Sequence, residues 1–324
     1  MPNHLISLPA KIRSLRAILL FAFAWLSVSF VAALCGICNV SAASTLDVIA
    51  HQAARYPEGV TRIKQVFWYA EMASNRIARW QGEQIQTFAM PGGCGPTAVE
   101  SYGELLIVLC HLNHRFLLVT PTGKVMHSQS RSNSGVALYH PNDAVRDDRG
   151  GIYFSSSGDF ADAAPALGRI FYLAPSGAVA EVASGIHYAN GVEFDRVGHR
   201  LLVSAHLDRR VLAYPVLASG QLGARRTLHD LRDQITRSED WMVGPDGLHL
   251  DQEGTLRVAL YGGAKVVVFA NDTVRSIDTP MQFPTTVYHD PRVGLFVGGV
   301  FDLSDRLLGG QVILIRSDAA VMGH

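Results

Sequence analysis

A short unit recurs along this chain and restricts the possible fold more than any other feature. Each copy has a polar residue, a short alternating strand, an Asp-x-x-Gly turn and a second strand. The turns of the three clearest copies are Asp147–Gly150, Asp195–Gly198 and Asp251–Gly254. Asp accepts backbone hydrogen bonds within such a turn and Gly tolerates positive φ, so each copy predicts a β-hairpin.

The polar residue that opens each copy is its anchor, and three weaker copies align on the same pattern. The six anchors are Glu58, Thr97, Asn142, Asn190, Asp246 and Thr286, at intervals of 39, 45, 48, 56 and 40 residues. Further strand-like runs, such as Phe116–Val119 and Lys265–Phe269, bring each unit to four strands. This spacing predicts an all-β fold, a six-bladed β-propeller with four-stranded blades.

Other architectures fit the pattern less well. A β-sandwich needs about seven strands, which is too few for this chain. Helical periodicity does not recur between the strands, which argues against a parallel sheet with alternating helices. Residues 231–243 are expected to form a helical turn or a loop over one face of the ring.

The first 43 residues predict a targeting segment. A basic region ending at Arg16 precedes the apolar run Ala17–Ile37, and Val40–Ala43 offers small residues for cleavage. We therefore expect a signal peptide at 1–43, a single propeller domain at 44–324, and export to the periplasm or the medium. The apolar run is also long enough to span a bilayer, so an uncleaved signal anchor with an extracytoplasmic propeller is the alternative.

Two cysteines remain after the leader, Cys94 and Cys110, and they flank the first strand pair of one blade. In an oxidising compartment they pair if their Cα atoms lie within about 7 Å. The alternative is that both are small buried residues at a contact between blades.

The charge balance excludes one class of partner. Lys plus Arg and Asp plus Glu both number 28, and no basic run follows the leader. An electrostatic footprint for nucleic acid is therefore missing, and a small molecule is the expected partner.

Four anchors carry side-chain oxygens that a ring of blades would direct to one axis: Glu58, Asn142, Asn190 and Asp246. A single anchor of this kind is most often a turn cap. Four in equivalent positions, with two carboxylates and two amides, indicate a site for one divalent cation. Calcium prefers oxygen ligands of this kind, and Zn²⁺, Mn²⁺ and Mg²⁺ are the alternatives.

The same segments resemble the family of senescence marker protein 30, gluconolactonase and luciferin-regenerating enzyme. The segments are Glu58–Gly59, Arg76–Trp80, Pro141–Asp143, Asn190–Gly191 and Pro245–Gly247, and the resemblance spans about residues 56–316. It implies a six-bladed propeller that binds a divalent cation in its central channel through the four anchors named above. It also implies an enzyme, a metal-dependent lactonase of the esterase type that opens a lactone to a hydroxy acid.

The resemblance also suggests roles for individual residues. The cation would polarise the lactone carbonyl while a water attacks, and Asp246 is the expected catalytic residue for proton transfer. His140 stands where the family commonly has a substrate-binding Arg, so it is the candidate substrate-binding residue. Val60 stands where Pro is commoner. Both departures from the family pattern affect the expected substrate more than the expected binding of the cation.

Two alternative functions stay open on the same scaffold. One is a related propeller with other chemistry, phosphotriesterase-like or strictosidine-synthase-like. The other is a non-catalytic exported propeller that binds a partner. A Gly-x-Ser-x-Gly elbow and a His-Glu-x-x-His motif are absent from the sequence, which argues against ordinary serine hydrolases and zincins. His111 and His114, three residues apart in an expected strand, are predicted to face opposite sides and not to act together.

Overall fold

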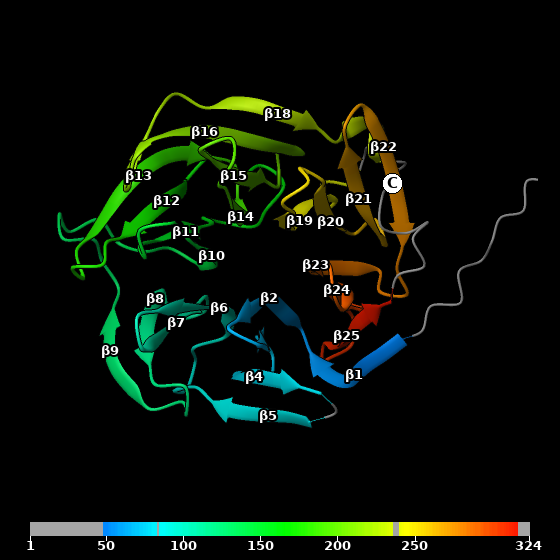
Figure 1. Cartoon of the computed structure of the whole chain (residues 1–324), viewed down its shortest axis with the longest axis horizontal. Coiled ribbons are helices and arrows are strands. Elements are labelled where there is room, and N and C mark those ends of the chain that lie inside the picture. Colours follow the sequence, from blue (N-terminus) through cyan, green and yellow to red (C-terminus); the bar gives the residue numbers. More distant parts are fainter. Residues whose placement is uncertain (1–47, 83, 236–239, 317–324) are drawn as a thin grey trace, which may run out of the picture. The chain divides into compact units, whose positions relative to one another are not determined.

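The computed structural model describes residues 48–82, 84–235 and 240–316, and the expected leader at 1–43 lies outside these ranges. Six antiparallel sheets form a ring, and one edge strand of each sheet lies nearest the centre (Figure 1). The predicted all-β, six-bladed propeller is confirmed. Among the described residues, no helix is long and apolar enough to cross a membrane.

Blades 1 to 3 each contain four consecutive strands, ordered from the axis outward. Blade 1 has β2 (Pro57–Ile63), β3 (Val66–Glu71), β4 (Arg76–Gln81) and β5 (Gln84–Ala89); blade 2 has β6 (Pro96–Tyr102), β7 (Leu105–Cys110), β8 (Arg115–Val119) and β9 (Val125–Gln129); blade 3 has β10 (Pro141–Arg146), β11 (Ile152–Ser156), β12 (Gly168–Leu173) and β13 (Val179–Ile186).

Blades 4 to 6 include an extra edge strand and the closure of the ring. Blade 4 has β14 (Ala189–Asp195), β15 (Arg200–Ala205) and β16 (Arg210–Ala218), with β17 (Gln221–Leu222) and β18 (Arg226–Asp230) both on β16; blade 5 has β19 (Gly244–Leu250), β20 (Leu256–Tyr261), β21 (Lys265–Ala270) and β22 (Thr273–Asp278); blade 6 has β23 (Phe283–Asp290), β24 (Gly294–Val300), β25 (Gly309–Ile315) and β1 (Val48–Arg55). Because β1 pairs with β25, the first described strand closes the last blade. Between blades 4 and 5 the expected helical turn appears as a short 3-10 helix, Arg232–Gln234.

The core is divided among the contacts between blades. Six clusters of buried apolar side chains each join two neighbouring blades, and together they run round the ring. The second strand of a blade is packed on both faces, so β11, β20 and β24 are buried along their whole length. Outer strands such as β9 are largely exposed. The hydrophobic effect therefore stabilises the ring as a whole more than any single blade.

The Asp-x-x-Gly turns form as predicted, with one exception. Asp147 Oδ1 accepts the N–H of Gly151 at 2.8 Å, and Gly150 has a φ of 84°. In the turn after β14, the positive φ falls on His199 instead of Gly198. A Cβ on Gly198 would lie 2.3 Å from the Asp195 carboxylate, so the glycine leaves room for the ion pair between Asp195 and Arg200.

A β-bulge lies near the start of every inner strand. The pairing register of the first two strands shifts next to each anchor in all six blades. Such a bulge bends the strand and changes the direction in which a side chain points. The repeated bulge therefore places the anchors in equivalent orientations.

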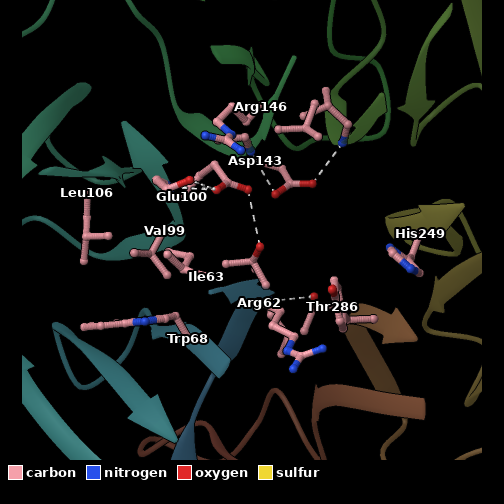
Figure 2. Close-up of a pocket in the computed structure, with 18 of the residues that line it drawn as sticks. Arg62, Ile63, Trp68, Val99, Glu100, Leu106, Asp143, Arg146, His249 and Thr286 are labelled. Carbon is pink, nitrogen blue, oxygen red and sulfur yellow. Dashed lines mark hydrogen bonds between the residues drawn. The ribbon is translucent and has the colours of Figure 1, made fainter. Parts of the chain in front are cut away.

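The residue after each anchor connects neighbouring blades. Asp143 Oδ2 accepts the Val192 N–H at 2.9 Å, and Thr286 Oγ1 accepts the Val60 N–H at 3.0 Å (Figure 2). Thr286 is thus equivalent to Asp143, so the anchor of blade 6 is Thr285 and the sequence-based assignment of Thr286 was wrong by one residue. The slip arose because two threonines stand side by side.

Three other blades have glycine at this position, since the next blade lies too close for a side chain. A Cβ on Gly59 would lie 2.5 Å from the Thr97 carbonyl oxygen, and one on Gly191 would lie 2.4 Å from the Asp246 carbonyl oxygen. Close backbone approach between inner strands therefore defines the width of the channel.

Two glycines with nearly the same backbone conformation test this constraint. Gly59 has a φ of 54° and Gly103 a φ of 59°, but a Cβ on Gly103 would meet nothing within 4 Å. Gly103→Ala should cost about 1 kcal/mol for the left-handed conformation alone. Gly59→Ala should cost about 2 kcal/mol more, because the inner strands must separate. Urea unfolding of both variants measures the difference, and equal losses would contradict the close approach.

Candidate active site and metal centre

The four predicted cation ligands occupy equivalent places on four blades. Each lies within the first three residues of its inner strand: Glu58 on β2, Asn142 on β10, Asn190 on β14 and Asp246 on β19. All four are buried, with exposed fractions of 7, 6, 4 and 4 %. Residues up to 188 positions apart in the sequence therefore reach one buried region at the axis.

Electrostatic interactions show how near the two carboxylates lie. Burial raises the pKa of Glu58 well above its ordinary value, and the charges of Asp246 and Asp143 add to the shift. Burial likewise raises the pKa of Asp246, and Asp143 is the charge that contributes most. The Asn190 side chain donates a hydrogen bond to Asp246 and favours its ionised form. The strongest charges acting on both ligands are thus other carboxylates.

Each ligand is positioned through the carbonyl group that precedes it. In all four cases that oxygen accepts a hydrogen bond from a side chain of the preceding blade. The pairs are Thr285 Oγ1 to Pro57 O, Thr97 Oγ1 to Pro141 O at 3.2 Å, Ser157 Oγ to Ala189 O at 2.8 Å, and His206 Nδ1 to Pro245 O at 3.1 Å. The ligand geometry is therefore fixed by contacts between blades.

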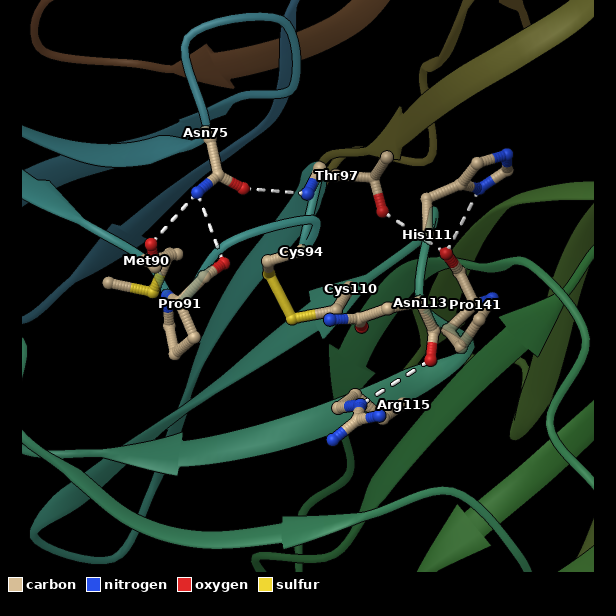
Figure 3. The surroundings of a disulfide bond; sticks show 11 residues. Asn75, Met90, Pro91, Cys94, Thr97, Cys110, His111, Asn113, Arg115 and Pro141 are labelled. Atoms are coloured by element: carbon tan, nitrogen blue, oxygen red, sulfur yellow. Dashed lines mark hydrogen bonds between the residues drawn. A yellow bond between two sulfur atoms is a disulfide. The ribbon is translucent and has the colours of Figure 1, made fainter.

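The two cysteines reinforce one of these contacts. The structure pairs Cys94 with Cys110, with a Cα–Cα distance of 4.4 Å (Figure 3). Cys94 precedes β6 and Cys110 ends β7, so the bond joins the segments that carry Thr97 and His111. Both of these side chains contact the Pro141 carbonyl oxygen at 3.2 Å. The disulfide therefore joins the two segments whose side chains hold the carbonyl group before Asn142.

Asp143 is a third carboxyl group of this region, partly buried, that sequence reasoning did not select. Burial raises its pKa to about 7, while hydrogen bonds from the Val192 and Ala144 N–H groups oppose the shift. Its place next to Asn142 in the Pro-Asn-Asp segment was the available signal. Its contact with the next blade, which gives it a structural function, depends on tertiary packing.

An aromatic cluster stands beside the carboxylates. Its members are Tyr56, Phe160, Tyr188, His206, Trp241 and Tyr261. The Tyr56 and Tyr261 hydroxyl oxygens are 3.1 Å apart. Burial raises the pKa of each tyrosine, and the charges of Glu58 and Asp246 add to the shift. The three tyrosine side chains therefore lie near the candidate cation site.

Backbone geometry brings some of these side chains to the site. Tyr56, His140 and Tyr188 each stand two residues before an anchor and have φ values of 49°, 55° and 57°. Positive φ is costly for residues other than glycine, and such residues concentrate at functional sites. A bulky residue two positions before Glu58, Asn142 and Asn190 was the sequence signal for them, and only His140 was selected.

His140 belongs to a group of three imidazoles. Its ring centroid is 4.6 Å from that of His111 and 4.4 Å from that of His114. The prediction that His111 and His114 face opposite sides was wrong, because β7 ends at Cys110 and both residues lie in the following turn. Burial lowers the pKa of His111 to about 3, and burial and His114 lower that of His140.

The donor set fits a hard divalent cation. Two buried carboxylates and two amide oxygens offer only oxygen ligands, and a cation would relieve the repulsion between the carboxylates. Within the described ranges, no three His, Cys, Asp or Glu side chains are grouped to hold a metal ion. The amide oxygens of Asn142 and Asn190 are therefore needed to complete the set.

Together these features define a class of protein, a six-bladed propeller with buried acid and amide side chains at the starts of its inner strands. The family described as the SMP-30/Gluconolactonase/LRE-like region matches residues 56–292, more than half of the chain. The chain belongs to this family.

Individual relatives match this chain at low identity. Regucalcin of Gallus gallus is 24% identical over 224 residues, covering 64% of this chain and 69% of the chicken protein. A solved luciferin-regenerating enzyme has a TM-score of 0.68 at 16% identity, covering 84% of this chain and 96% of that one. A solved calcium-binding protein, regucalcin, of Agrobacterium tumefaciens has a TM-score of 0.67 at 18% identity, covering 82% and 91%.

A gluconolactonase of Xanthomonas campestris has a TM-score of 0.65 at 19% identity, covering 83% of this chain and 90% of that one. At such identities the solved structures support the fold alone.

The crowded carboxylates predict an unusual effect of Asp246→Asn in the cation-free protein. A carboxyl with a raised pKa in the folded chain stabilises the fold at low pH, and this contribution is lost as pH rises through the folded-state pKa. Asparagine cannot ionise, so the variant should be about 1–2 kcal/mol more stable than the natural chain at pH 8. The difference should shrink at pH 5.

Urea unfolding in a chelator at the two pH values measures this effect. Asp272→Asn is the matched control, because Asp272 is exposed in the turn between β21 and β22. An Asp246→Asn variant that is less stable than the natural chain at both pH values would contradict the electrostatic argument.

Proposed function

We propose that this protein is a divalent-cation-dependent hydrolase that opens a lactone or a related ester to a hydroxy acid. Membership of the SMP-30/Gluconolactonase/LRE-like family supports a hydrolase of this kind. The observation that carries the proposal is the buried pair Glu58 and Asp246, which have carboxylates as their strongest charged neighbours. Two carboxylates buried near each other destabilise the folded chain. Such a pair is therefore expected where it serves a function.

Glu58, Asn142, Asn190 and Asp246 would hold the cation, and we propose Ca²⁺. All four ligands are oxygen donors, and a solved structural relative is described as a calcium-binding protein. When bound, the cation would polarise the lactone carbonyl and stabilise negative charge on its oxygen. Zn²⁺, Mn²⁺ and Mg²⁺ are the competing ions.

Asp246 is the proposed general base. Burial raises the pKa of its carboxyl, which brings proton affinity closer to the range useful near neutral pH. The hydrogen bond from Asn190 orients the carboxyl. Asp246 would accept a proton from the attacking water and return it to the departing alkoxide.

His140 is the proposed substrate contact. Its Nδ1 lies 3.2 Å from the His111 carbonyl oxygen and donates to it, which leaves the neutral Nε2 as an acceptor. Among the described residues, no hydrogen bond to His140 Nε2 is formed. A substrate hydroxyl could therefore donate to this nitrogen. The aromatic cluster would pack against the ring of the substrate and exclude water from the site.

The proposed location is outside the cytoplasm, either periplasmic or secreted, or membrane-anchored if the leader is uncleaved. The leader sequence supports export, and the Cys94–Cys110 disulfide is the kind of bond that persists in an oxidising compartment.

Acid release from a panel of sugar lactones, simple lactones and aryl lactones tests the proposed reaction. Turnover by the full chain should require Ca²⁺ and be lost in a chelator. Asp246→Asn should lower kcat/KM by about 10²- to 10⁴-fold, because the base is removed, while Asp272→Asn leaves it unchanged.

Thermal unfolding in the same samples separates catalysis from cation binding. Saturating Ca²⁺ should stabilise the natural chain, by about 2.7 kcal/mol at one hundred times the Kd, and should stabilise Glu58→Gln much less. Stabilisation without any lactone turnover would favour a non-catalytic propeller. Phosphotriester turnover without lactone turnover would favour a different chemistry.

A further inference from the structure

A cavity, called the far cavity below, occupies the end of the channel beyond the four predicted ligands. Its volume is about 620 Å³, within the range of small-molecule sites. It is lined by later residues of the inner strands, such as Thr61–Lys64, Val99–Ser101 and Val145–Arg146, and by none of the four ligands. Exposed residues such as Lys64 and Glu104 border it, so it is open to solvent.

One side of this far cavity is apolar. Ile63, Trp68, Val99 and Leu106 line the wall between blades 1 and 2 (Figure 2). Trp68, Val99 and Leu106 are 4, 2 and 3 % exposed, so their positions are fixed by the core. The wall can therefore receive an apolar ring or chain at little cost in side-chain ordering.

The part of the cavity nearest the axis is acidic. Glu100, Asp143 and Glu193 line it from three successive blades, and the charges of Glu100 and Glu193 both act on Asp143. Glu193 Oε2 accepts a hydrogen bond from His249 Nδ1 at 3.0 Å. The three carboxylates therefore lie near one another.

Glu100 differs from the other charged residues of the cavity. It accepts hydrogen bonds only from neutral donors: the Ser101 N–H and hydroxyl and the Thr61 hydroxyl. Among the basic residues that line the cavity, Arg62 pairs with Asp290 and Arg196 pairs with Asp148. Arg146 lies exposed at the border, and its charge acts on Glu100 without forming an ion pair with it. Within the described residues, Glu100 forms no ion pair. A carboxylate in this setting attracts a cation from solvent.

The lining distinguishes between kinds of cation. A bare metal ion would leave the apolar wall and most of the volume without a contact. An organic ammonium ion uses both the carboxylate and the wall.

We propose that the far cavity binds a small organic amine in its ammonium form, with the charged group at Glu100 and an apolar ring or chain against Ile63, Trp68, Val99 and Leu106. This site lies beyond the four predicted ligands along the channel, which it adjoins at Gly59, Asp143 and Gly247, and its occupation requires no metal ion.

Calorimetric titration of the full chain in a chelator tests the proposal with three probes of similar shape: 2-phenylethylammonium, 2-phenylethanol and phenylacetate. The ammonium ion should bind at least about tenfold more tightly than the alcohol, and phenylacetate should be weaker still. Equal binding of the three probes, or no heat from the ammonium ion up to about 10 mM, would overturn the proposal.

Two variants locate the charged group. Glu100→Gln keeps the size of the side chain and should weaken ammonium binding at least about tenfold while leaving the alcohol unchanged. Glu104→Gln, at the exposed border of the same cavity, is the matched control and should bind like the natural chain. Ammonium binding unchanged in Glu100→Gln would refute the role of Glu100.

A third variant blocks the apolar side of the cavity. This test remains informative even if Glu100→Gln does not fold. Ile63 is partly buried near the end of β2, so Ile63→Trp should fill the cavity and abolish binding of both the ammonium ion and the alcohol. Its calcium-dependent thermal shift should match that of the natural chain and so report an intact ring. Retained ammonium binding in Ile63→Trp would place the amine elsewhere and overturn the proposal.

Discussion

The candidate site depends on hydrogen bonds that each blade gives to the backbone of the next one at the axis. Ser157 holds the carbonyl group before Asn190, and His206 holds the one before Asp246. A ligand residue is therefore placed by two blades at once, and no isolated blade could form the site. Closure of the ring by β1 on β25 fixes the last of these contacts, between Thr285 and Pro57. The contacts that hold neighbouring blades together are thus the same contacts that position the candidate site.

The distribution of charge among the six anchors follows from burial. Carboxylates on all six blades would repel one another strongly in a buried channel. The structure instead has two carboxylates, two amides and two threonines, and the threonine hydroxyls of Thr97 and Thr285 donate to the carbonyl groups before Asn142 and Glu58. The two neutral threonine anchors thereby help to position the predicted ligands Asn142 and Glu58. Even so, the remaining pair opposes folding, which a bound cation would offset.

Local chemistry explains what the sequence predicted well. The hairpins and the spacing of the blades arise from short segments such as Asp147–Gly150, whose hydrogen bonds close within the turn. The aromatic cluster was missed because it unites distant segments: Tyr56 and Tyr261 are 205 residues apart. The contact of Asp143 with Val192 was missed for the same reason. The histidine turn after β7 was misread because alternation was assumed to continue beyond the end of the strand.

The residue after each anchor sets the width of the channel. It also lies between the predicted ligands and the far cavity. Glycine is required where the next blade presents a carbonyl group, as at Gly191 and Gly247. A side-chain acceptor is required where the next blade presents an N–H, which explains Asp143 and Thr286. Because Asp143 follows Asn142 directly, this acceptor also lines the far cavity and acts electrostatically on Asp246. One position in the repeat therefore contributes to the contacts between blades, to the surroundings of the predicted ligands and to the far cavity. Its residue type accordingly differs among blades although the fold repeats.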